Sequence, residues 1–155
     1  MTSPRNRRVV ITGLGVVSSV GFGKEAFWDS ISKGRSGVSN ITAFDTTQFT
    51  THFAGEIKNF DPSAYILPKK LKRMDRTTQF AVVASKMAVE DAKLDLEEPG
   101  VRERTGVIIG AALAGVGFIL EQHEGMLKKG PMRINPFTAL ASFPEIGRAS
   151  CRERV

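Results

Sequence analysis

The chain has 155 residues, 41% of them hydrophobic and 25% charged, which is enough for one domain with a core and too few for two ordinary domains. Its single cysteine, Cys151, excludes an internal disulfide framework and fits a reducing compartment. No apolar run reaches about 18 residues, so the sequence predicts no transmembrane helix. Arginines near the two ends contribute much of the formal net charge of +6. The charge therefore does not indicate a generally basic, nucleic-acid-binding surface.

The first predicted element is a buried strand at residues 9–11, which are all β-branched and apolar. Gly13 and Gly15 follow it, and a strand running into Gly-x-Gly suggests a dinucleotide-binding turn. That fingerprint needs a third Gly or Ala where this chain has Ser18, and an acidic residue about 20 positions later, where residues 32–35 are basic. A dinucleotide-binding oxidoreductase domain is therefore a disfavoured alternative.

The next segments read as one helix, a long irregular stretch and a second helix. Residues 24–33 predict a helix that turns apolar Ala26, Phe27 and Ile31 toward the core and ends at Gly34. Residues 36–65 lack a helical period and fit loops with short extended pieces. After a basic turn at residues 69–73, an apolar stripe with helical spacing predicts a helix over about 76–94. The stripe consists of Phe80, Val83, Ala84, Met87 and Ala88, and turns polar at Asp91.

The remaining pattern completes an α/β arrangement. Residues 97–100 have the composition of a turn, residues 105–110 predict a second buried strand, and residues 115–129 predict a helix. The order strand, helix, helix, strand, helix indicates an α/β domain with a largely parallel sheet.

The glycine-rich opening, residues 9–21, resembles the start of the β-ketoacyl-acyl carrier protein synthases, the condensing enzymes of the thiolase fold. The type II elongation synthases are the most similar. Further motifs recur in the family's order: Phe44-Asp45, Phe53-Ala54-Gly55, Lys72-Arg73-Met74-Asp75-Arg76 and the segment 110–117. The resemblance implies an incomplete first half of a thiolase-like fold, with a mainly parallel sheet packed by helices.

The resemblance extends over about residues 7–144, so we expect a partial synthase N-terminal domain at 1–144. Residues 145–155 instead look like translated sequencing-adapter read-through, and we expect a non-native, disordered tail there. Cys151 falls in that tail without the strand, small-residue turn and helix that activate a nucleophile, so it is not proposed as catalytic. His52 and His123 are predicted to face solvent, and neither has partners at metal-ligand spacing.

The resemblance implies that the intact protein elongates fatty acyl chains by decarboxylative Claisen condensation with malonyl-carrier protein, without a cofactor or metal. In the family, the catalytic cysteine and both catalytic histidines follow the part that this chain matches. No catalytic residue is therefore assigned here, and the chain by itself is expected to be inactive.

The resemblance also implies binding positions. Leu113 and Phe137 match residues that line the acyl pocket, Phe137 from across a dimer interface, although both could be ordinary core residues. Lys69, Lys72 and Arg73 match basic positions that receive the acidic acyl carrier protein, although they could form a solvated turn. A cytoplasmic homodimer that binds neither nucleic acid nor membrane is implied. A non-catalytic subunit of the chain-length-factor type, from a polyketide synthase, remains an alternative.

Overall fold

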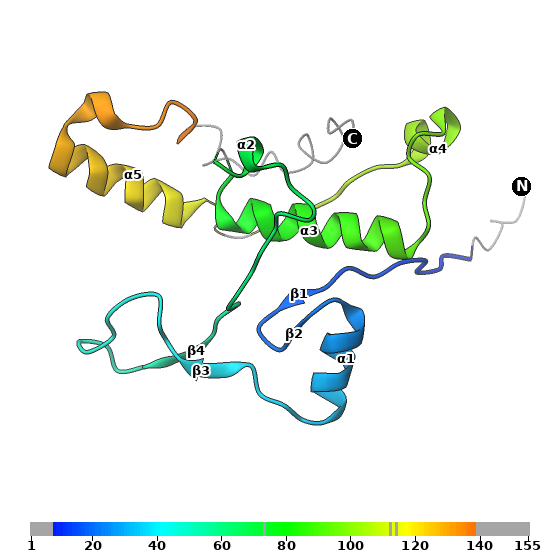
Figure 1. Ribbon diagram of the computed structural model, residues 1–155, viewed down its shortest axis with the longest axis horizontal. Coiled ribbons are helices and arrows are strands. Elements are labelled where there is room, and N and C mark those ends of the chain that lie inside the picture. Colours follow the sequence, from blue (N-terminus) through cyan, green and yellow to red (C-terminus); the bar gives the residue numbers. More distant parts are fainter. Residues whose placement is uncertain (1–7, 73, 112, 114, 139–155) are drawn as a thin grey trace, which may run out of the picture.

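The computed structural model describes residues 8–72, 74–111, 113 and 115–138 (Figure 1). Its long helix α3 runs through the middle. The β1–β2 hairpin, α1 and the β3–β4 hairpin lie on one side of α3, α2 and α4 lie on the other, and α5 extends past its N-terminal end. The elements in chain order are β1 (Val17–Ser18), β2 (Gly21–Phe22), α1 (Lys24–Ser32), β3 (Val38–Asn40), β4 (Phe53–Gly55), α2 (Pro68–Leu71), α3 (Arg76–Asp91), α4 (Pro99–Arg104), α5 (Val116–Lys129) and a 3-10 turn, η1 (Pro131–Arg133).

The core forms where α3 meets the segment before α2. Val82 and Val83 of α3 and Ile66 are fully buried, and six half-buried apolar side chains pack around them. The predicted apolar stripe thus gives the expected helix, although α3 ends at Asp91 rather than near residue 94. The chain leaves the helix because Lys93 adopts a left-handed backbone conformation, with φ of 51°. The six surrounding side chains are Val17, Phe60, Tyr65, Leu71, Met74 and Met87.

Gly13 and Gly15 bring the N-terminal segment into backbone contact with α3. A Cβ atom added at Gly15 would lie 1.8 Å from the carbonyl oxygen of Ala84, and one added at Gly13 would lie 2.2 Å from that of Ala88. Only glycine permits this approach. The Gly-x-Gly spacing, which matches two successive turns of α3, therefore serves helix packing.

Two predicted strands, residues 9–11 and 105–110, are not formed. Val9 is 91% and Ile108 99% exposed, so the prediction that these segments are buried was wrong for the described chain. A strand needs a hydrogen-bonded neighbour, and within the described ranges only β1–β2 and β3–β4 pair. Both pairs are antiparallel, so the expected mainly parallel sheet is also absent from this part of the chain.

The helices agree better with prediction. Helix α1 ends at Ser32, one residue before the predicted end, and Gly34 follows with a φ of +64° and donates its N–H to the Ile31 carbonyl at 3.1 Å. Of its three predicted core residues only Phe27 is half-buried, and Ala26 and Ile31 are exposed. Helix α5 matches its predicted span. Helix α4 was not predicted, since Pro99, interpreted as part of a turn, is its first residue.

Candidate functional site

The predicted basic segment lies on α2 and at its end. Pro68 starts this helix, as proline readily does. Lys69 and Lys72, one helical turn apart, are both exposed, while Leu71 between them packs against the core. Within the part of the chain that the structure describes, neither lysine forms an ion pair or a side-chain hydrogen bond. Both charges are thus available to a partner. Arg73, the third predicted member, lies outside the described residues.

Asp75 fixes the start of α3 directly after this segment. This residue is buried, with only 5% of its surface exposed to solvent. It accepts hydrogen bonds from the backbone N–H groups of Thr77 at 2.9 Å and Thr78 at 3.2 Å, and from the Thr78 hydroxyl. These bonds satisfy donors that a helix N-terminus leaves free. The motif that carried the family resemblance thus contains a helix cap, which the aspartate before the apolar stripe could have indicated.

Arg76 joins α3 to the chain that follows β4. Its Nη2 donates to the carbonyl oxygen of Ile57 at 2.6 Å. Its guanidinium carbon lies 5.1 Å from the ring centroid of Phe80 and 5.9 Å from that of Phe60. The two rings meet edge to face, with centroids 4.7 Å apart, in the geometry that aromatic pairs favour. No local sequence pattern indicates this role for Arg76.

The two predicted acyl-pocket residues flank α5 in the sequence, Leu113 before it and Phe137 after η1. Leu113 precedes the helix and is 78% exposed. Phe137 is half-buried after η1, where its N–H donates to Asn135 Oδ1 at 2.9 Å. The N–H of Asn135 in turn donates to Gln122 Oε1 of α5 at 2.9 Å. Neither Leu113 nor Phe137 lines the cavity described next, so their assignment to an acyl pocket stays a prediction.

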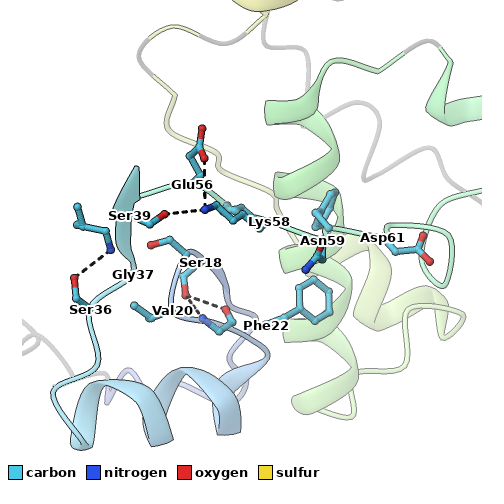
Figure 2. A pocket seen from close by; sticks show the side chains of 15 residues that line it. Ser18, Val20, Phe22, Ser36, Gly37, Ser39, Glu56, Lys58, Asn59 and Asp61 are labelled. Carbon is cyan, nitrogen blue, oxygen red and sulfur yellow. Dashed lines mark hydrogen bonds and ion pairs between the residues drawn. The ribbon is translucent and has the colours of Figure 1, made fainter. Parts of the chain in front are cut away.

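A cavity of about 670 Å³ lies between the β1–β2 hairpin, the start of β3 and residues 56–61 (Figure 2). Lys58 reaches across it, donating to Ser39 Oγ at 2.8 Å and lying 3.9 Å from a carboxylate oxygen of Glu56. The Ser18 hydroxyl turns back to the Gly21 carbonyl at 2.9 Å. The Lys58–Ser39 bond links the chain after β4 to β3, and the Ser18–Gly21 bond lies within the β1–β2 hairpin.

Glu56 is held ionised at the edge of this cavity. Hydrogen bonds from the Thr42 hydroxyl and N–H, with a further bond from the Ala43 N–H, lower the pKa of its carboxyl group. A carboxylate with this many donors is a poor general acid. The residues lining the cavity include no histidine or cysteine.

The remaining titratable candidates are solvent-facing, as predicted. His52 is exposed, with Nδ1 3.1 Å from the Thr46 hydroxyl, and His123 is exposed on α5. Among the described residues no group of three His, Cys, Asp or Glu side chains could hold a metal ion. None of the helices in the described ranges has the length and apolarity needed to cross a bilayer. Cys151 lies outside the described residues.

The arrangement of elements is similar to part of solved ketosynthase structures. The structure is similar to that of the ishigamide ketosynthase/chain length factor, with a TM-score of 0.69 and 30% identity, over 94% of this chain and 37% of that one. It also shares the fold of a type II PKS ketosynthase solved in complex with its acyl-carrier protein, with a TM-score of 0.73 and 21% identity, over 91% and 38% of the two chains.

The sequence places the chain in one family. Residues 6–146 match the family described as "Beta-ketoacyl synthase, N-terminal domain", so the chain belongs to the β-ketoacyl synthases. It is 40% identical to the 3-oxoacyl-[acyl-carrier-protein] synthase 2 of Staphylococcus aureus strain COL over 142 residues, and this match covers 92% of the chain. The chain spans 34% of that relative's length. The incomplete thiolase-like α/β fold expected from the sequence is thereby confirmed.

Proposed function

We propose that the chain forms the N-terminal part of a 3-oxoacyl-[acyl-carrier-protein] synthase that lengthens fatty acyl chains. A cysteine thiolate from the rest of the protein takes the acyl group and releases the carrier thiol. Malonyl-carrier protein then loses carbon dioxide, and its carbanion attacks the enzyme thioester and expels the thiolate. Two histidines and backbone N–H groups stabilise the oxyanions. The 40% identity over nearly the whole chain carries this proposal.

Lys69, Lys72 and Arg73 would receive the acidic carrier protein. The exposure of Lys69 and Lys72, and their freedom from ion pairs within the described chain, support this role. So does the ketosynthase of similar fold that was solved with its acyl-carrier protein. Charges that meet mostly in water contribute modestly to affinity and mainly accelerate association.

Leu113 and Phe137 would contact the acyl chain once the rest of the protein encloses them, and the complete enzyme would be a cytoplasmic homodimer. The exposure of Leu113 supports a surface that another part of the assembly covers. The native domain would continue past residue 144 in place of residues 145–155. Recovery of the uninterrupted reading frame after Phe143 tests this directly, since it should encode a strand followed by a turn with a nucleophilic cysteine.

The carrier-binding role is tested in the complete synthase with the double variant Lys69→Glu/Lys72→Glu. We expect the apparent KM for carrier-protein substrates to rise about three- to ten-fold and its salt dependence to weaken. Turnover of a small acyl thioester that bypasses the carrier should not change. Lys93→Glu, an exposed charge at the opposite end of α3, is the matched control. Unchanged carrier kinetics at low salt would show that α2 is only a solvated turn.

The 155-residue chain by itself should form no acyl-enzyme. Cys151 is its only thiol, and it lacks the surrounding sequence that lowers a thiol pKa in this family. Incubation with acyl-carrier protein followed by intact-mass measurement should show no acyl adduct. A specific adduct that disappears in Cys151→Ala would contradict the proposal.

A non-catalytic subunit of the chain-length-factor type is the second candidate, favoured by the 30% identity to the ishigamide ketosynthase/chain length factor. The same reading frame separates the two candidates. A chain-length factor would lack the nucleophilic cysteine, whereas a synthase would have it.

A further inference from the structure

The loop that carries α2 is closed at its base by Arg76. Ile57 and Arg76 are 19 positions apart in the sequence, yet the Arg76 guanidinium donates to the Ile57 carbonyl at 2.6 Å. Phe60, on the same side of the loop as Ile57, meets Phe80 of α3 edge to face, and the guanidinium lies over both rings. The chain therefore leaves the fold after Phe60 and re-enters it at Arg76, at one point.

Contacts inside the loop hold α2 against α3. Ile66, just before α2, is buried with Val82 and Val83. The Tyr65 carbonyl accepts from Lys86 Nζ at 2.8 Å. After α2, the Met74 carbonyl accepts from Gln79 Nε2 at 3.1 Å. The loop is thus fixed on both flanks of α2, and Lys69 and Lys72 point away from the packed side into solvent.

We propose that Arg76 is a positioning residue for carrier-protein recognition. By closing the loop base it keeps Lys69 and Lys72 in one orientation, without itself touching the carrier. This inference rests on the proposed function of α2. A loop whose ends are held together samples fewer conformations. The apparent affinity is proportional to the fraction of molecules in the binding-competent conformation, so a looser loop binds more weakly.

Arginine suits this position in a way that lysine does not. Its planar guanidinium can stack on aromatic rings while an N–H from its edge reaches a carbonyl, whereas an ammonium group is a compact point charge. Arg76→Lys therefore keeps the positive charge and loses the clamp, and Arg76→Met loses both. Comparison of the two separates a positioning role from a direct contact with an acidic partner.

The test compares the complete synthase with its Arg76→Lys and Arg76→Met variants. Both should raise the apparent KM for carrier-protein substrates about three- to ten-fold, leave kcat with a small acyl thioester unchanged, and keep the wild-type salt dependence. Both should also speed tryptic cleavage after Lys69 and Lys72, since a looser loop fits a protease more easily. Arg76 is exposed, so neither variant removes a core side chain.

Several outcomes would overturn the inference. Wild-type KM in Arg76→Lys would mean that the charge acts directly, and unchanged tryptic cleavage would mean that no clamp exists. A parallel loss of kcat with the small thioester would indicate a general structural defect. If Lys69→Glu/Lys72→Glu leaves carrier kinetics unchanged while the Arg76 variants still speed cleavage, the proposed carrier surface fails and the clamp stands. The two failures are therefore distinguishable.

Discussion

Asp91, at the end of α3, accepts hydrogen bonds from the Lys24 ammonium at the start of α1 and from the Leu14 N–H at 2.9 Å. One carboxylate thus joins the end of α3 to two points near the N-terminus, 67 and 77 positions away in the sequence. The bond from Lys24, and next the bond from Leu14, hold the pKa of Asp91 below its usual value of 3.8. The hydrogen bond that Lys24 donates to Asp91 raises the pKa of Lys24 above 10.5.

The pH dependence of stability follows from the lowered pKa of Asp91 and the raised pKa of Lys24. A lowered carboxyl pKa contributes stability above about pH 3.8 that is lost as the pH falls through the folded-state pKa. A raised lysine pKa contributes stability below about pH 10.5 that is lost as the pH rises through the folded-state value. Asp91→Asn should therefore lower the urea midpoint at pH 7 and flatten its decline below pH 4. A urea midpoint that declines below pH 4 as steeply in Asp91→Asn as in the wild type would contradict this account.

Gly15→Ala should strongly destabilise the fold. The added methyl group would lie 1.8 Å from the Ala84 carbonyl oxygen and 2.8 Å from the Ala88 nitrogen, so backbone would have to move. We expect a loss of about 3 kcal/mol in the free energy of unfolding. Gly106→Ala, where nothing lies within 4 Å of the added atom, is the control and should be neutral or slightly stabilising. Equal urea midpoints for the two variants would refute the close contact with α3.

Asp75→Ala should remove the cap of α3. Two backbone N–H groups and the Thr78 hydroxyl would lose their acceptor in a buried position. We expect a cost of about 1–2 kcal/mol in the free energy of unfolding, measured by urea denaturation. Asp75→Asn keeps an acceptor oxygen and should retain most of the stability. A loss as large in Asp75→Asn would show that both carboxylate oxygens are needed, since Thr77 and Thr78 bond to different ones.

Exposed apolar segments should make the isolated chain self-associate. Val9 and Ile108 are almost fully exposed on stretches whose composition suits a buried strand, and unpaired extended segments of this kind promote association between chains. Sedimentation should show a mass that increases with concentration. Val9→Thr/Ile108→Thr keeps the β-branched shape and should reduce association several-fold. A wild-type chain that stays monomeric at high concentration would contradict this expectation.

Helical parts of this protein were predictable because a helix makes its hydrogen bonds within its own segment. The stripe from Phe80 to Ala88 was enough to predict α3, and the left-handed glycine at Gly34 marked the end of α1. The order of motifs along the chain was enough to predict the family. Helix α4 was not predicted because a proline and a glycine at its start are as typical of a loop turn as of the first turn of a helix.

The strands and the partners of polar side chains were decided by tertiary structure. A strand forms its hydrogen bonds with distant chain, so residues 9–11 and 105–110 have strand composition and no strand among the described residues. The roles of Arg76 and Asp91 depend on Ile57, Phe60 and Lys24, which no local pattern connects to them. Local sequence determined where the chain forms helices. Tertiary structure decided which side chains close the loops. The hydrogen bonds of Arg76 and Asp91 form only when separate segments pack together, because they join atoms that are distant along the chain.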